Sequence, residues 1–290
     1  MESSPAMRIL RRACLPLFLA SGLLAQPSPA PGYRIREIVS APLGDGGPAR
    51  QALLDRPYAL ATDPAGNIYV GELAGRIRRI DPAGIITTIA GLGDGVSSGD
   101  GGPARSAGLA EVYSLAFSNG FLFLAERGDS CLIRRIQIST GTITRVAGTG
   151  SCAAAADGAA LTTPLRFPGS LAFDRDNNLH FTEDSRIRKL VNGQLLSVHT
   201  PGSRESGIAF EPSGRLLIAD GCRLRAISPF DQRVETISGQ ADFCRVASGD
   251  GGLLRNAFLN KATAPALDPT GSELYFSDGS GLANNTTVTR

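Results

Sequence analysis

Short apolar runs, each ending in an acidic residue, recur along the chain. They are NIYVGE (67–72), FLFLAE (121–126), NLHFTE (178–183), RLLIAD (215–220) and ELYFSD (273–278). Each of them follows a first short apolar run, and turn residues such as DPAGN (63–67) separate the two. Apolar runs of this length joined by Asp, Asn, Pro and Gly predict β-hairpins.

Two more runs follow in most repeats. One is basic, as in RIRRID (76–81), and the other is rich in β-branched residues, as in IITTIAG (85–91). Each repeat therefore predicts four short antiparallel strands, whereas PARQALL (48–54) is the best candidate for a brief helix. A single twisted sheet cannot bury both of its apolar faces, so four-stranded repeats predict a β-propeller with one repeat per blade.

The predicted fold class is all-β, with the propeller at 33–290. Five blades are expected at about 58–91, 112–148, 169–200, 207–240 and 264–290. The fifth repeat lacks a fourth strand, and YRIREIVS (33–40) has the register of one. We expect 33–40 to complete the fifth blade, because closure removes an exposed sheet edge. The competing interpretation is a truncated six-bladed ring.

The order of these motifs resembles a known repeat. GDGGPAR (44–50), followed by PYALA (57–61), NIYV (67–70), RIRRID and IITTIAG, is similar to the NHL-repeat propellers of secreted bacterial proteins. The resemblance extends from about Tyr33 to the C-terminus and is weakest in the fifth repeat. It implies the fold but no single function, because such propellers include both binding platforms and enzymes.

The GDGGPAR motif returns at 99–105, and the related ADGAA (156–160) and GDGG (249–252) precede later repeats. A feature present once per blade is expected to be an inter-blade turn, in which glycine supplies positive φ angles. A phosphate loop would need Lys followed by Ser or Thr. A calcium loop would need several oxygen ligands, and DRDNN (174–178) aligns instead with the hairpin turns.

The acids that end the second runs form either a catalytic ring or ion pairs with the basic runs. They are Glu72, Glu126, Glu183, Asp220 and Asp278, and an arginine recurs at 78, 134, 188 and 225. We expect the ion pairs. His180 and His199 are the two histidines; His180 replaces Tyr69 of the first repeat and is expected to pack inside a strand. Two histidines cannot form the zinc centre of the family's amidating-lyase branch, so no catalytic residue, metal ligand or cofactor is predicted.

The first 25 residues have the pattern of a secretory signal peptide. Arginines precede the apolar run CLPLFLASGLLA (14–25), and small residues follow, so cleavage is expected after Ala25 or as late as Ala30. The leader carries the formal net charge of +2, which leaves a mature chain that is close to neutral. We therefore expect no nucleic-acid partner, no membrane span in the mature chain, and a secreted or periplasmic location.

Four cysteines remain after the leader, and an even number in an exported chain favours disulfides. Cys131 and Cys222 each precede a basic third strand, whereas Cys152 and Cys244 each follow a fourth strand. The start of one strand of an antiparallel hairpin lies beside the end of the other. The predicted bonds are therefore Cys131–Cys152 and Cys222–Cys244.

The even repetition favours a non-catalytic binding platform for a protein or glycan partner, which the sequence does not identify. The alternative is a metal-dependent propeller hydrolase of the gluconolactonase or regucalcin kind, in which carboxylates and amides hold a cation at the central channel. A third interpretation is a structural segment of a larger surface protein. An enzyme is expected to break the repeat symmetry with polar residues near the axis.

Overall fold

The computed structural model describes residues 43–200, 207–239, 253–260, 262–268, 271, 273–278 and 287–289. The predicted signal peptide and the predicted closing strand at 33–40 lie outside these residues. In the described part, the regular structure is almost entirely strand, and no helix is long and apolar enough to span a bilayer. The predicted brief helix is one 3-10 turn, η2 (Ala49–Gln51), which recurs as η3 (Ala104–Ser106) and η4 (Leu254–Asn256).

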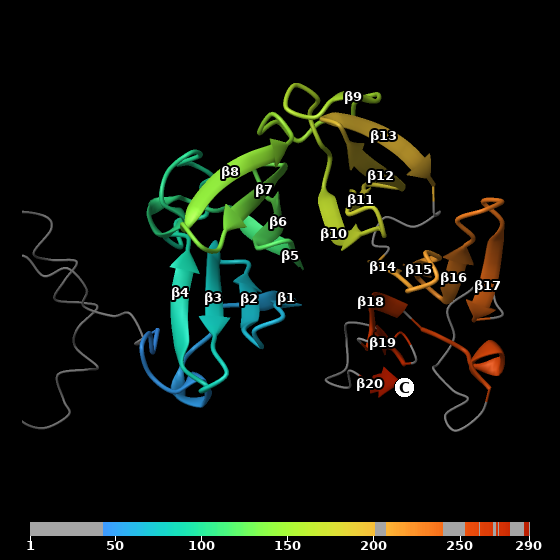
Figure 1. Cartoon of the computed structure of the whole chain (residues 1–290), viewed down its shortest axis with the longest axis horizontal. Coiled ribbons are helices and arrows are strands. Elements are labelled where there is room, and N and C mark those ends of the chain that lie inside the picture. Colours follow the sequence, from blue (N-terminus) through green and yellow to red (C-terminus); the bar gives the residue numbers. More distant parts are fainter. Residues whose placement is uncertain are drawn as a thin grey trace, which may run out of the picture. The chain divides into compact units, whose positions relative to one another are not determined.

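The strands of the described residues form five antiparallel sheets (Figure 1). The first contains β1 (Pro57–Thr62), β2 (Ile68–Glu72), β3 (Arg76–Ile80) and β4 (Ile86–Ala90); the second contains β5 (Glu111–Ser118), β6 (Phe121–Arg127), β7 (Leu132–Gln137) and β8 (Thr142–Ala147). The third contains β10 (Pro168–Phe173), β11 (Leu179–Glu183), β12 (Arg186–Val191) and β13 (Gln194–His199), with the short β9 (Gly158–Ala159) at its outer edge. The fourth contains β14 (Gly207–Phe210), β15 (Leu216–Asp220), β16 (Arg223–Ile227) and β17 (Val234–Ser238), and the fifth contains β18 (Ala262–Leu267), β19 (Leu274–Asp278) and β20 (Thr287–Thr289).

Successive sheets pack face to face through their apolar side chains. The first strands contact one another in order, β1 with β5, β5 with β10, β10 with β14 and β14 with β18. One core cluster joins Tyr69 and Ile77 of the first sheet to Val112 of the second. The approach there is so close that a Cβ on Gly71 would lie 2.6 Å from Val112 Cγ1. The chain is therefore a β-propeller whose sheets are blades, and the predicted fold class is confirmed.

The GDGGPAR motif covers the outer edge of the blade that follows it. Gly46 N–H donates to Ile86 O at 2.8 Å, beside β4, and in the second copy Gly101 N–H donates to Ile143 O at 2.8 Å, beside β8. In the third blade β9 pairs with β13 in the same way. The motif is thus an inter-blade connection, as predicted, and it also pairs with an edge that would otherwise be open.

The predicted Cys131–Cys152 disulfide is present. It ties the start of the third strand of the second blade to the segment after its fourth strand. Cys222 is also disulfide-bonded. Its predicted partner, Cys244, lies outside the described residues, so this pairing stays a prediction that non-reducing peptide mapping can check.

Candidate functional site

A buried arginine occupies the third strand of each of the first three blades. In the second blade, Arg134 Nη1 lies 3.2 Å from Glu126 Oε1 and its Nε lies 2.9 Å from Asp100 Oδ1. The same guanidinium donates to two backbone carbonyls, Gly108 O at 2.9 Å and Ser98 O at 2.8 Å. Arg134 and Glu126 are fully buried, so each charge depends on the other for compensation.

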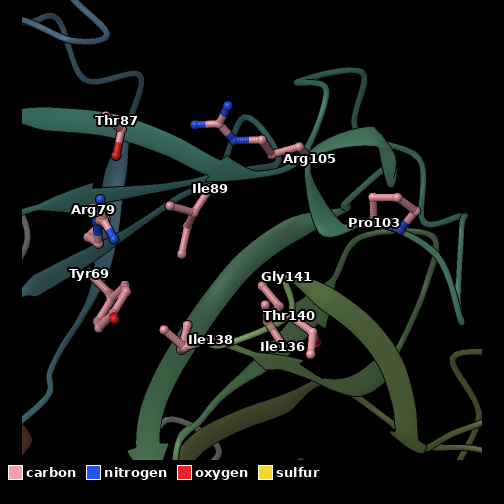
Figure 2. Close-up of a pocket in the computed structure, with 10 residues that line it drawn as sticks. All are labelled: Tyr69, Arg79, Thr87, Ile89, Pro103, Arg105, Ile136, Ile138, Thr140 and Gly141. Atoms are coloured by element: carbon pink, nitrogen blue, oxygen red, sulfur yellow. The ribbon is translucent and has the colours of Figure 1, made fainter.

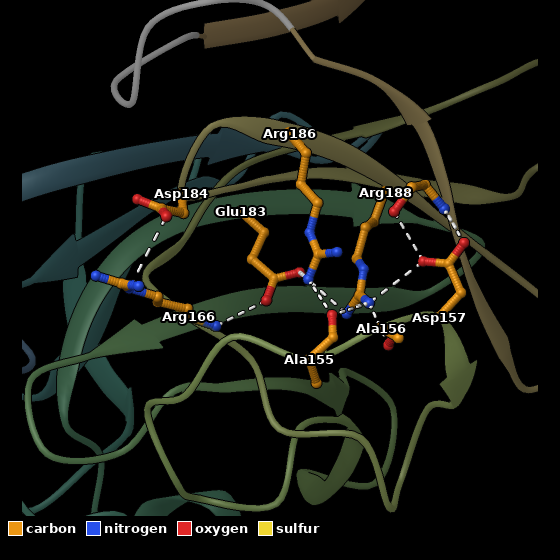
Figure 3. A network of polar contacts seen from close by, with 9 residues as sticks. Ala155, Ala156, Asp157, Arg166, Glu183, Asp184, Arg186 and Arg188 are labelled. Atoms are coloured by element: carbon orange, nitrogen blue, oxygen red, sulfur yellow. Dashed lines mark hydrogen bonds and ion pairs between the residues drawn. The ribbon is translucent and has the colours of Figure 1, made fainter.

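The third blade repeats this arrangement (Figure 3). Arg188 lies 3.0 Å from Glu183 and 3.3 Å from Asp157, and it donates to Ala156 O at 2.7 Å. Glu183 accepts a further bond from Arg166 N–H at 2.8 Å. The predicted pairing of acids with arginines is therefore confirmed in these blades.

The first and fourth blades follow the same plan. Arg78 pairs with Glu72 and with Asp45 of the first GDGGPAR motif, and Arg225 pairs with Asp220. The side chain of Asp278, the fifth acid of the series, lies outside the described residues. The acids at 72, 126, 183 and 220 are thus engaged with neighbouring arginines, as predicted.

The aspartate of the inter-blade motif, Asp45 in the first blade and Asp157 in the third, links strands within this network. Asp45 Oδ1 also accepts from Thr88 N–H at 2.8 Å, and Asp157 Oδ2 accepts from Ser197 N–H at 2.8 Å. Each side chain therefore joins the inter-blade segment to an arginine of the third strand and to the backbone of the fourth. Neither a phosphate nor a cation is needed to explain the recurrence of this aspartate.

The acids of the first hairpins hold turns. Asp63 accepts from Asn67 N–H at 2.9 Å and from the Tyr69 hydroxyl at 2.8 Å. Asp174 accepts from Asn178 N–H at 2.8 Å, which confirms that the DRDNN segment is a hairpin turn. These local bonds are the ones that Asp provides in Asx turns.

Asp174 also contacts a histidine and a lysine. Its Oδ2 lies 3.1 Å from Nε2 of the buried His180 and 2.8 Å from Nζ of Lys189. Although burial opposes ionisation, hydrogen bonds from Lys189 and Asn178 hold the pKa of Asp174 well below its usual range. Burial lowers the pKa of His180. His180 is thus packed in a strand, as predicted.

A hollow of about 360 Å³ lies over the first hairpins of the third, fourth and fifth blades, and Asp174, Glu211 and Asp268 line it. Glu211 accepts a bond from the Ser213 hydroxyl at 2.8 Å, and Asp268 accepts a bond from Glu273 N–H at 2.7 Å. In the part of the chain that the structure describes, no three His, Cys, Asp or Glu side chains are grouped as metal ligands. These acids are therefore accounted for as turn-forming residues.

An aromatic and cationic cluster breaks the repeat near the inner strands. Tyr58 on β1 and Tyr113 on β5 have ring centres 4.3 Å apart, and their hydroxyls are joined by a 2.7 Å hydrogen bond. The Arg127 guanidinium at the end of β6 lies 3.3 Å from the centre of the Tyr113 ring. Tyr58 is 52% exposed, which is unusual for a large ring on an inner strand. We call these three residues the Tyr–Arg cluster.

The position equivalent to the two tyrosines is a glycine in the third blade. A Cβ on Gly169 would lie 2.8 Å from Arg127 Nη2, so a side chain there would displace the guanidinium from Tyr113. Arg127 is further held by its Nε, which donates to Pro168 O at 2.8 Å. The repeat pattern of the sequence does not single out this cluster, although PYALA, VYSLA and PGSLA differ by the substitution of glycine for tyrosine at 169.

Comparison with known proteins identifies the fold. The chain matches no protein-family model. Among solved structures it is similar to a protein of unknown function from Bacteroides thetaiotaomicron VPI-5482, at 14% identity and a TM-score of 0.55, covering 81% of this chain and 56% of that one. It is also similar to a chain of a nidogen–laminin complex (16%, TM-score 0.53, covering 77% and 72%) and to a gluconolactonase from Xanthomonas campestris (13%, TM-score 0.53, covering 76% and 68%).

These are β-propellers. At such identities the likeness shows the fold alone, and this chain spans a little over half of the first of them. One of them is a chain of a nidogen–laminin complex and another is a gluconolactonase. The comparison therefore supports the architecture, and any function has to be argued from the side chains.

Proposed function

We propose that the protein is an exported NHL-type propeller that acts as a non-catalytic binding platform, with the Tyr–Arg cluster as its contact surface. The partner is a protein or a glycan outside the cytoplasm. The export signal is the predicted leader at 1–25. The Cys131–Cys152 disulfide supports export, because such bonds persist in oxidising compartments.

The exposed Tyr58 and the partly buried Tyr113 that it contacts are the observation that carries this proposal. Tyrosine and arginine are enriched at binding surfaces, because a rigid ring offers a large contact area at a low entropic cost. The rings of Tyr58 and Tyr113 come from two neighbouring blades, and Arg127 fixes one of them. The recurring acids of the second strands and of the first hairpins are engaged in ion pairs and turns.

The proposal is tested with a double variant, Tyr58→Ala with Tyr113→Ala, compared with wild type on a panel of immobilised polysaccharides and on the surface of the exporting cells. We expect the variant to lose binding and to remain folded, which its melting curve checks, because Tyr58 is half exposed and Tyr113 is only partly buried. Phe230→Ala is a matched control, since Phe230 is a 91% exposed ring on the outer β16–β17 turn.

The hydrolase alternative is checked with the same proteins. Lactone hydrolysis would be measured with and without a chelator, alongside metal analysis of the purified protein. Hydrolysis that requires a divalent cation and persists in the double variant would overturn the proposed function. Binding that is equal in wild type and the double variant would exclude the Tyr–Arg cluster as the contact surface.

A further inference from the structure

A groove of about 360 Å³ lies between the first and second blades (Figure 2), and no residue of the Tyr–Arg cluster lines it. The first blade contributes Tyr69, Arg79 and Thr87, and the second contributes Ile136 and Ile138. Arg105, from the second GDGGPAR motif, completes it on the outer side. None of the residues that line this groove is acidic.

The first-blade residues form a row across three strands. Arg79 is paired in register with Tyr69 on β2 and with Thr87 on β4, so the three side chains share one face of the sheet. The Tyr69 hydroxyl already donates to Asp63. Arg79 Nε and Thr87 Oγ1 are buried and have no hydrogen-bond partner. The row therefore presents polar atoms that lack an acceptor or donor.

The equivalent cations of other blades are satisfied within the protein. In the second blade, Arg135 lies 4.5 Å from the centre of the Phe121 ring. In the third blade, Lys189 forms an ion pair with Asp174 at 2.8 Å. Arg79 forms no ion pair with any residue that the structure describes. Arg79 is half-buried, and its buried Nε lacks an acceptor. Because charged groups in such positions are usually compensated, the guanidinium of Arg79 offers a place for an external anion.

The groove has the charge and the walls for an organic anion. The guanidinium groups of Arg79 and Arg105 both border the groove in Figure 2, whereas Ile136 and Ile138 form an apolar wall on the other side. Arginine binds carboxylate and phosphate through paired N–H groups. Pockets of several hundred cubic ångströms with apolar walls and a few polar groups are typical of small-molecule sites.

We propose that this groove binds a small organic anion, in which a carboxylate or a phosphate monoester is attached to an apolar body. The anionic group contacts Arg79 and Arg105, and the apolar body lies against Ile136 and Ile138. The groove is separate from the proposed contact surface. It is lined by β2, β3, β4 and the β7–β8 turn, whereas the Tyr–Arg cluster lies on β1, β5 and β6.

The test is calorimetric titration of the full protein at low ionic strength with three probes of similar shape. Phenylacetate and phenyl phosphate carry the anion, and phenylacetamide is the neutral control. We expect saturable binding of at least one anion. The affinity for the amide should be about ten-fold lower or more, because the amide carries no negative charge to strengthen its hydrogen bond with arginine. The tighter of the two anions identifies the ligand class.

Variants then locate the site. Arg79→Gln and Arg105→Gln are each expected to weaken anion binding about ten-fold. Arg50→Gln is the matched control, because Arg50 occupies the position of Arg105 in the first motif and does not line the groove. Arg135→Gln is the second control, and both controls should stay within about two-fold.

Three results would overturn the proposal: no saturable binding of either anion, equal binding of the amide, or equal losses in Arg50→Gln and Arg79→Gln. Melting curves identify a variant that fails to fold, and in that case Arg79→Lys, which retains the charge, is used. Tyr58→Ala with Tyr113→Ala should leave anion binding unchanged. A negative result for the anion site can therefore be distinguished from a negative result for the proposed binding platform.

Discussion

Replacing Arg134 with methionine removes a buried cation from the second blade and leaves its partners in place. Glu126 would then be a fully buried carboxylate without its cation, and solvent could not replace that cation because the pair is sealed inside the blade. The carbonyls of Gly108 and Ser98 would each lose a donor. Asp100 is partly exposed and can be solvated by water, so losing its contact with Arg134 costs less stability.

The expected cost follows from these contacts. Removing one member of a buried ion pair costs about 3–5 kcal/mol, and a buried carbonyl without its donor costs about 1–3 kcal/mol. The contributions are not additive within one network, so we expect a loss of about 4–6 kcal/mol in the free energy of unfolding. Burial already raises the pKa of Glu126 to about 7, so protonation relieves part of the cost below that pH. The loss should therefore be larger at pH 8 than at pH 5.5.

Urea unfolding followed by circular dichroism measures this loss. Arg135→Met is the matched control: it changes the next residue, an exposed arginine over Phe121, and should cost less than about 1 kcal/mol. Adding Glu126→Leu to Arg134→Met should recover part of the stability, because it removes the orphaned charge. A loss in Arg134→Met no greater than in Arg135→Met, or a double variant less stable than the single one, would refute the reasoning.

Three further outcomes are expected. Replacing Cys131 and Cys152 with alanine should lower the free energy of unfolding by about 3 kcal/mol in denaturant titrations, because the bond closes a loop of about 20 residues. Because the pKa of Glu126 is raised in the folded state, folding takes up a proton between the two pKa values. The resulting stabilisation is fully present below the unfolded pKa near 4.5 and is lost as pH rises through about 7. Glu126→Gln should flatten this part of the curve of unfolding free energy against pH. Deleting 33–40, the proposed closing strand, should lower the melting temperature in one cooperative transition, and an unchanged transition would argue against closure there.

Local features of the sequence predict the blades well. Alternating apolar runs and hairpin residues act over a few positions, so strands such as β2 and β11 appear where the pattern indicates. The pairing of Glu126 with Arg134 is also predictable, because the acid and the arginine recur together on adjacent strands, where Arg134 lies opposite Leu124 and thus diagonal to Glu126. The tie from Asp100 to Arg134 is not, since it depends on how a connection 34 residues away folds back along the blade.

The two candidate sites depend on differences between repeats that look alike in sequence. Arg79 and Lys189 occupy the same place in their blades, and only the structure shows that Lys189 has an ion pair with Asp174 whereas Arg79 has none with the described residues. In a propeller, a residue that recurs in every blade is explained by the contact that every blade needs. A residue that departs from the repeat, or one that lacks the internal contact made by its counterparts in other blades, has no such explanation. The exposed Tyr58 and the unpaired Arg79 are departures of these two kinds, which is why binding is assigned to them and not to the recurring acids.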